Sequence, residues 1–145
     1  MPSNESVTLK LKPGAANGQG WTTTTASNGQ QYSYKYTGGH NDNGSMKTKV
    51  GDGTATLNLT VDADNRYGLS NVTFQNDTYN QLTWSASPDM QSGTITDVNT
   101  QVETANYTTI AYDAQNGNAT IPCDPMIGND PRGPCAQIHH QQAGY

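Results

Sequence analysis

The fold is decided by residues 54–61, which read Thr54-Ala55-Thr56-Leu57-Asn58-Leu59-Thr60-Val61. In this stretch the apolar side chains alternate strictly with Thr and Asn. A period of two places the two sets of side chains on opposite faces of an extended strand. The stretch therefore predicts an amphipathic strand with one buried face.

The neighbouring sequence repeats this pattern in short segments. Residues 47–50 precede the stretch and are separated from it by Gly51-Asp52-Gly53, which predicts a hairpin between 47–50 and 54–61. Turn residues separate further strand candidates. These candidates are 7–12, 22–25, 31–36, 69–74, 81–85, 93–98, 107–112 and 118–121.

The composition favours strands over helices. Only 32% of the 145 residues are hydrophobic and 13% are charged, while Thr, Asn, Gly, Ser and Tyr are abundant. Thr and Tyr favour strands, whereas Asn and Gly favour turns. We therefore predict an all-β, antiparallel two-sheet sandwich of about eight strands.

The C-terminal segment differs from the rest of the chain. Four of the 7 prolines lie in it, at Pro122, Pro125, Pro131 and Pro134. Because proline cannot donate to a strand ladder, the segment is expected not to form an interior strand. We predict a sandwich domain over 1–121 and an irregular arm over 122–145, which packs on the domain or on a neighbouring subunit.

The net charge of −5 argues against two classes of partner. Nucleic acids and anionic membranes are both recognised by clustered Lys and Arg. No apolar run is long enough to span a membrane, so no membrane insertion is expected. No signal peptide is visible over Met1–Lys12, which leaves a cytoplasmic protein or an extracellular one whose leader has been removed.

Cys123 and Cys135 enclose eleven residues. A disulfide there would close a loop rich in Pro and Gly, and two reduced thiols are the alternative. The spacing to His139 and His140 fits no ordinary zinc site.

Asp62 and Asp64 begin a segment that resembles a calcium loop, but Arg66 stands where a ligand is required. An ordinary Asp/Asn turn explains the same residues. No catalytic motif is present, and we expect no metal and no cofactor.

Tyr32, Tyr34 and Tyr36 fall on one face of a strand, and Trp84 adds another large ring. If the rings are exposed, they provide flat surfaces on which sugar rings stack. Alternatively they form the core, because the chain has one Phe and few Leu or Ile. Asn-x-Ser/Thr triplets also occur, at Asn4, Asn43, Asn58, Asn71, Asn76, Asn106 and Asn118, and are either glycosylation sites or a product of the Thr/Asn-rich composition.

The sequence Cys123-Asp124-Pro125-Met126-Ile127-Gly128-Asn129-Asp130-Pro131 follows the last strand candidate. It resembles the C-terminal end of small bacterial β-sandwich proteins of the DP-EP type. The resemblance implies an immunoglobulin-like sandwich of unassigned function and brings no catalytic residues. The cysteine pair and the tail after Pro134 are not part of that pattern.

These observations favour a non-enzymatic structural or surface protein that self-associates. The low charge leaves sheet edges poorly protected by Lys, and the arm is long enough to reach a neighbour. The alternatives are a carbohydrate-binding module that uses Tyr32, Tyr34, Tyr36 or Trp84, and a small hydrolase with loop carboxylates.

Overall fold

The chain folds into eleven strands and one short 3-10 turn over the residues that the structure describes. The computed structural model describes residues 4–16, 21–39, 44–123 and 137–141. The strands are β1 (Asn4–Pro13), β2 (Thr22–Thr25), β3 (Gln31–Gly38), β4 (Met46–Lys49), β5 (Ala55–Val61), β6 (Tyr67–Gln75), β7 (Leu82–Ala86), β8 (Ser92–Asp97), β9 (Thr104–Asp113), β10 (Ala119–Cys123) and β11 (Gln137–Gln141). The turn η1 (Ala114–Asn116) joins β9 to β10.

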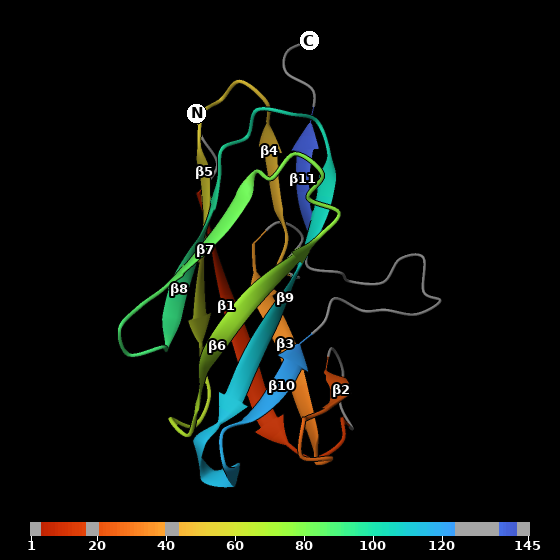
Figure 1. Ribbon diagram of the computed structural model, residues 1–145, viewed down its shortest axis with the longest axis vertical. Coiled ribbons are helices and arrows are strands. Elements are labelled where there is room, and N and C mark those ends of the chain that lie inside the picture. Colours follow the sequence, from red (N-terminus) through yellow and green to blue (C-terminus); the bar gives the residue numbers. More distant parts are fainter. Residues whose placement is uncertain (1–3, 17–20, 40–43, 124–136, 142–145) are drawn as a thin grey trace.

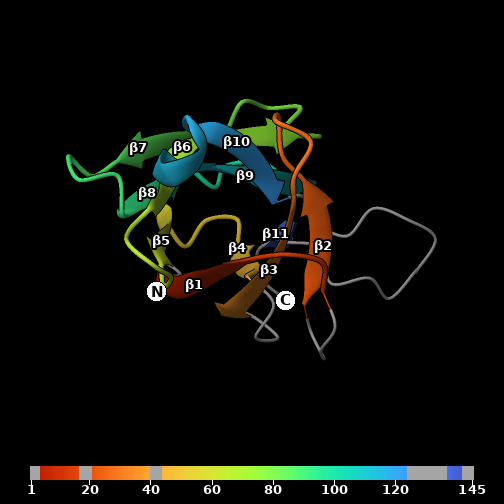
Figure 2. The same ribbon diagram turned by 90° about the horizontal axis from the view of Figure 1, so that it is seen from below.

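The strands form two sheets that enclose one core (Figures 1 and 2). The first sheet has six strands in the order β2-β3-β1-β5-β8-β7. The second has five, with β10, β11 and β6 all paired to β9 and with β4 beside β11. The all-β, two-sheet prediction is confirmed, although eleven strands replace the expected eight and the strand order does not establish an immunoglobulin-like topology.

Among the described strands, two pairs are parallel and the others are antiparallel. β1 runs antiparallel to β3 on one side and parallel to β5 on the other. β11 likewise runs antiparallel to β9 and parallel to β4. The segments joining the members of each parallel pair therefore cross from one end of the sandwich to the other.

The predicted hairpin between 47–50 and 54–61 is wrong. β4 pairs with β11 in the five-stranded sheet, whereas β5 pairs with β1 and β8 in the six-stranded sheet. Gly51 and Gly53, with φ of 99° and 100°, carry the chain from one sheet to the other. A turn between two alternating segments serves a sheet-to-sheet connection as well as a hairpin, because both segments still bury their apolar faces in the same core.

The C-terminal arm is not irregular throughout. Residues 137–141 form β11, which lies between β9 and β4, and Ile138 is fully buried. The proline argument did not apply here because this segment contains no proline. Pro122 itself lies in β10, which pairs only with β9 among the described strands, and a position at a sheet edge is where a strand tolerates proline.

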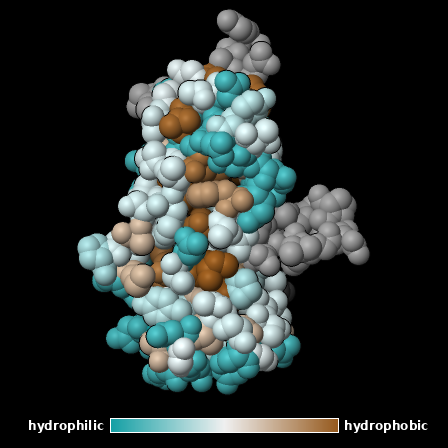
Figure 3. Space-filling view, viewed as in Figure 1, coloured by the Kyte–Doolittle hydropathy of each residue, from teal (hydrophilic) through white to brown (hydrophobic). Residues whose placement is uncertain are grey.

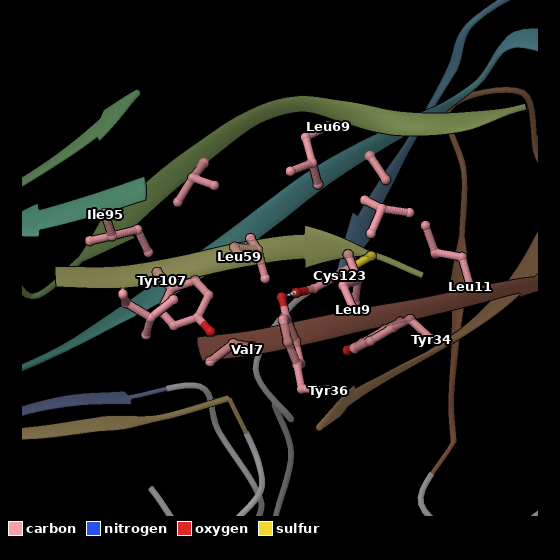
Figure 4. Close-up of a cluster of buried hydrophobic side chains, with 14 of the residues drawn as sticks. Val7, Leu9, Leu11, Tyr34, Tyr36, Leu59, Leu69, Ile95, Tyr107 and Cys123 are labelled. Carbon is pink, nitrogen blue, oxygen red and sulfur yellow. Dashed lines mark hydrogen bonds between the residues drawn. The ribbon is translucent and has the colours of Figure 1, made fainter. Parts of the chain in front are cut away.

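The core is built from aliphatic residues of both sheets and from tyrosines (Figure 4). Tyr36 makes edge-to-face contacts with Tyr34 and Tyr107, with ring centroids 6.0 Å and 5.9 Å apart. The Tyr36 hydroxyl oxygen lies 2.8 Å from the carbonyl oxygen of Cys123, which gives the buried phenol a polar partner. Tyrosine thus supplies the apolar area that the composition lacks, and its hydroxyl groups bond to the opposite sheet.

Candidate functional site

The three tyrosines of β3 are buried. Tyr32, Tyr34 and Tyr36 are 1%, 5% and 9% exposed, because their face of β3 points at the five-stranded sheet. Trp84 is half-buried and packs over Gly93, where an added Cβ would lie 2.3 Å from the indole ring. These residues belong to the core, so β3 offers no exposed aromatic row on which a sugar ring could stack.

Asp62 and Asp64 lie in the turn between β5 and β6. The Asp62 N–H donates to the Leu9 carbonyl, and the Asp64 carbonyl accepts from the Tyr67 N–H at 3.0 Å. Both aspartates are exposed. Within the described ranges, no three His, Cys, Asp or Glu side chains come together in a group that could hold a metal ion. The turn alone accounts for both aspartates.

The cysteine and sequon predictions remain untested. Cys123 is fully buried at the end of β10, and Cys135 lies outside the described residues, so their pairing stays a prediction. Among the sequons, five have an exposed asparagine: Asn4, Asn58, Asn71, Asn76 and Asn118. Asn43 lies outside the described residues, and glycosylation stays a prediction.

Among the described residues, no helix is both long and apolar enough to cross a membrane.

A buried polar cluster that no sequence motif marks surrounds Asp113 at the end of β9. Arg66 binds this carboxylate through two nitrogen atoms, Nε at 2.9 Å and an Nη at 2.6 Å. Tyr32 donates its hydroxyl proton at 2.7 Å, and Asn116 donates its amide at 2.6 Å. The backbone N–H of Gln115 completes the set at 3.0 Å.

The electrostatics of this cluster hold Asp113 in its charged form. Burial alone would raise the pKa of the carboxyl, but hydrogen bonds from Arg66, Tyr32 and Asn116 hold it well below its usual range. Arg66 and Tyr32 also line an open pocket of about 590 Å³ with Asn116, Gln30 and other residues. Because Asp113 is ionised and saturated with donors, the cluster is suited to joining strands rather than to transferring protons.

A second buried polar cluster holds β11 in place. His140 Nε2 lies 2.6 Å from Asp97 Oδ2, and both side chains are fully buried. With the imidazole protonated, this contact is an ion pair. The other ring nitrogen, Nδ1, lies 2.9 Å from the Glu103 carbonyl oxygen. Burial opposes the charged form of His140, yet Asp97 and the Glu103 carbonyl outweigh burial and raise the pKa of the imidazole.

The loop that follows β8 is tied to the same end of the sandwich. Asn99, with φ of 58°, donates its amide to the carbonyls of Lys49 and Gly53 at 2.5 Å and 3.0 Å. Gln81 accepts from the N–H groups of Thr100 and Gln101. The Asn99 bonds fix the loop between β8 and β9 against the connection from β4 to β5, and the Gln81 bonds fix it against the residue that precedes β7.

One lateral side of the sandwich, formed by β6 and β7, differs from the other. β7 is the end strand of the six-stranded sheet, and β6 pairs only with β9 among the described strands. Neither strand contains Lys, Arg, Asp, Glu or Pro. We call this the β6/β7 side.

The opposite side is covered or charged. On β2, Thr24 donates its hydroxyl to the Pro122 carbonyl, and the following Ser27 N–H donates to the Thr120 carbonyl, so the edges of β2 and β10 cover one another. β4 presents the exposed Lys47 and Lys49. Charged or covered edges resist pairing with another chain, and uncharged open edges favour it.

Sequence comparisons add no relative to this description. No protein-family model matches the chain, and no curated protein matches it significantly. The resemblance to the DP-EP type therefore stays a prediction.

Proposed function

We propose that this domain is a non-enzymatic structural protein that self-associates through its β6/β7 side. The observation that carries the proposal is the asymmetry between the two lateral sides of the sandwich. On one side the edges of β2 and β10 cover one another, and β4 carries two exposed lysines. On the other side the edges of β6 and β7 lie next to one another and carry no charged residue.

The usable part of β6 is its second half. At the start of the strand, Leu69 already donates its N–H to the Met90 carbonyl at 2.7 Å. A bulge between Leu69 and Asn71 then shifts the register against β9. Residues 71–75 follow the bulge as a regular strand, and within the described residues they have β9 on one side and no strand on the other.

Pairing with a second copy would extend both sheets. A two-fold axis beside the β6/β7 side would bring the same edges of two copies together in antiparallel pairs, which is the self-complementary geometry of a symmetric dimer. The backbone groups of residues 71–75 and of β7 would then bond across the interface. The immunoglobulin-like, DP-EP-type relationship is compatible with such a module and remains a proposal.

The test is the mass in solution as a function of concentration, by light scattering and sedimentation velocity. The double substitution Thr73→Lys and Ala86→Lys places a charge on each open edge at exposed positions. A matched control, Thr54→Lys with Thr120→Lys, makes the same change in net charge at exposed positions outside β6 and β7.

We expect the mass of the wild-type protein to rise with concentration, because association follows mass action. The edge variant should stay monomeric, and the control should behave like the wild type. A wild-type protein that remains a monomer at its highest soluble concentration contradicts the proposal, as does equal loss of association in both variants.

A further inference from the structure

The outer face of the six-stranded sheet carries an ordered, uncharged array of hydroxyl and amide groups. We call it the hydroxyl face. It is formed by alternate, outward-pointing residues of four adjacent strands. Beyond these residues the same outer face continues with Lys10 and Lys12 of β1 and with Lys35 of β3. Its members are Asn4, Ser6 and Thr8 of β1, Thr56, Asn58 and Thr60 of β5, Ser92, Thr94 and Thr96 of β8, and Thr83 and Ser85 of β7.

Strand register aligns these side chains in rows across the sheet. One row reads Asn4, Thr56, Thr96, Thr83, the next reads Ser6, Asn58, Thr94, Ser85, and the third reads Thr8, Thr60, Ser92. Neighbouring strands lie about 4.8 Å apart, and alternate residues of a strand lie about 6.7 Å apart. The array therefore covers a patch of roughly 14 Å by 13 Å.

Side-chain hydrogen bonds order the middle of the array. Asn58 donates to Asn4 Oδ1 at 3.1 Å and accepts from Thr94 Oγ1 at 3.0 Å. Thr56 also donates to Asn4 Oδ1. A shallow pocket of about 330 Å³ lies on the same face, lined by residues that include Asn58, Thr60, Ser85 and Thr94.

The chemistry of the hydroxyl face selects among partner classes. None of its eleven residues is charged, and the lysines of the same sheet face lie on β1 and β3, beyond the rows on β5, β8 and β7. A partner seated on β5, β8 and β7 therefore meets no cation that would recognise phosphates or anionic lipids. It has no Trp, Tyr, Met or Arg, the residues that dominate protein–protein hot spots. Hydroxyl and amide groups both donate and accept, which suits a partner that presents neutral hydroxyl groups.

The opposite face of the molecule lacks this uniformity. Figure 3 shows the outer face of the five-stranded sheet, where hydrophobic and hydrophilic residues are mixed. The half-buried Ile110 and Tyr112 of β9 lie at positions that alternate with the strand's core residues. Uniform small polar residues are therefore a property of the hydroxyl face and not of the surface as a whole.

We infer that the hydroxyl face binds a neutral polysaccharide, whose chain lies across β5, β8 and β7 and bonds to Asn58, Thr60, Ser85 and Thr94. Contacts of this kind are individually weak, because each hydrogen bond replaces a bond to water. Several copies joined through the β6/β7 side would bind one polymer with avidity. The binding surface itself does not depend on self-association.

The test is depletion of the protein from solution by insoluble neutral polysaccharides: microcrystalline cellulose, chitin and insoluble starch. The probe variant is Thr60→Ala with Thr94→Ala on the hydroxyl face, and the matched control is Thr54→Ala with Thr120→Ala elsewhere. Circular dichroism of both variants checks that the sandwich is retained. The single variant Thr73→Lys measures binding when pairing at the β6/β7 side is weakened, because Thr73 lies on β6 and does not line the pocket, whereas Ala86 does.

We expect the wild type and the control to be depleted by at least one of the three polymers, with little dependence on salt. The probe variant should bind about tenfold more weakly, since two hydrogen bonds are removed. Thr73→Lys should still bind, with lower avidity, so that loss of self-association and loss of binding are distinguishable.

Three results would overturn the inference: depletion by none of the three polymers, equal binding by the probe and control variants, or binding that high salt abolishes. If the probe variant instead loses self-association and the wild type binds no polymer, the hydroxyl face belongs to a second copy of the chain.

Discussion

Replacing Asp113 by Asn tests whether the buried carboxylate joins the two sheets. The Oδ2 atom accepts hydrogen bonds from Arg66, Tyr32 and Asn116, and Oδ1 accepts from Arg66 and Gln115. An amide has one acceptor oxygen, so whichever way it is turned at least two donors lose their partner. Each bond to a charged group is worth about 1.5–3 kcal/mol.

The loss is discounted because the Arg66 side chain is 18% exposed and water can solvate part of its charge. We expect the free energy of unfolding to fall by about 3–4 kcal/mol. This corresponds to a melting temperature lower by roughly 10 °C for a domain of this size. Urea unfolding at pH 7, followed by circular dichroism, measures the change, and the slope with urea should be unaltered.

The pH dependence gives an independent check on Asp113. Because its folded-state pKa is lowered, the carboxylate stabilises the fold above its ordinary pKa of about 4, and this stabilisation is lost as pH falls toward the folded pKa. The Asp113→Asn variant should therefore lose less stability on acidification than the wild type.

A double-mutant cycle with Arg66→Met isolates the ion pair. A destabilisation below about 1 kcal/mol by Asp113→Asn, or strictly additive effects in the cycle, would refute the assignment of Asp113 as the joint between sheets.

Three further predictions concern the core and β11. As pH rises above about 6.5, the His140→Gln variant should lose less stability than the wild type. The pKa of His140 is raised in the folded state, so its ion pair with Asp97 stabilises the fold fully below that pH and is lost as pH passes the folded pKa. Unfolding curves between pH 6 and pH 9 measure this difference, and parallel pH profiles of the two proteins would contradict it. Gly93→Ala should cost about 1–3 kcal/mol and shift the fluorescence of Trp84, because the new Cβ would lie 2.3 Å from its ring; an unchanged emission spectrum would show that the ring does not pack there. Tyr36→Phe should cost about 1–2 kcal/mol in urea unfolding, because it leaves the buried carbonyl oxygen of Cys123 without its hydroxyl partner, and a neutral effect would contradict that bond.

The sequence predicted which segments are strands because alternation is a local property of the chain. Every predicted strand segment overlaps an observed strand. Pairing is not local. The alternation within 47–50 and 54–61 is that of a hairpin, yet the two segments lie in different sheets. Each buries its apolar face in the core between the two sheets.

Strand β11 was not predicted, and the reason is different. Its five residues contain a single aliphatic side chain, Ile138, and follow a segment rich in proline. Its place between β9 and β4 is set by partners far away in sequence, including Asp97 and the backbone of Glu103. No pattern within residues 137–141 indicates those partners.

One feature of the sequence indicates that Asp97 and Asp113 are buried. Asp97 is in phase with Ile95, and Asp113 is in phase with Tyr107 and Ala111, so both occupy inward positions of amphipathic strands. An acid at such a position predicts a buried, paired carboxylate. The partner of Asp113 was not predictable, because Arg66 lies in the turn before β6, 47 residues away.

The two aspartates also explain how a core so poor in aliphatic residues fixes its register. Thr and Tyr tolerate both faces of a strand, so a slip by one residue costs a Thr/Tyr-rich strand less than a Leu-rich one. The same slip would turn Asp113 away from Arg66 and leave both charges unpaired, or turn Asp97 away from His140. The clusters lie at opposite ends of the sandwich, with the turn after β9 at the bottom and β11 at the top of Figure 1. Because a broken buried ion pair is strongly destabilising, each end of the sandwich is thereby held to a single alignment of its strands.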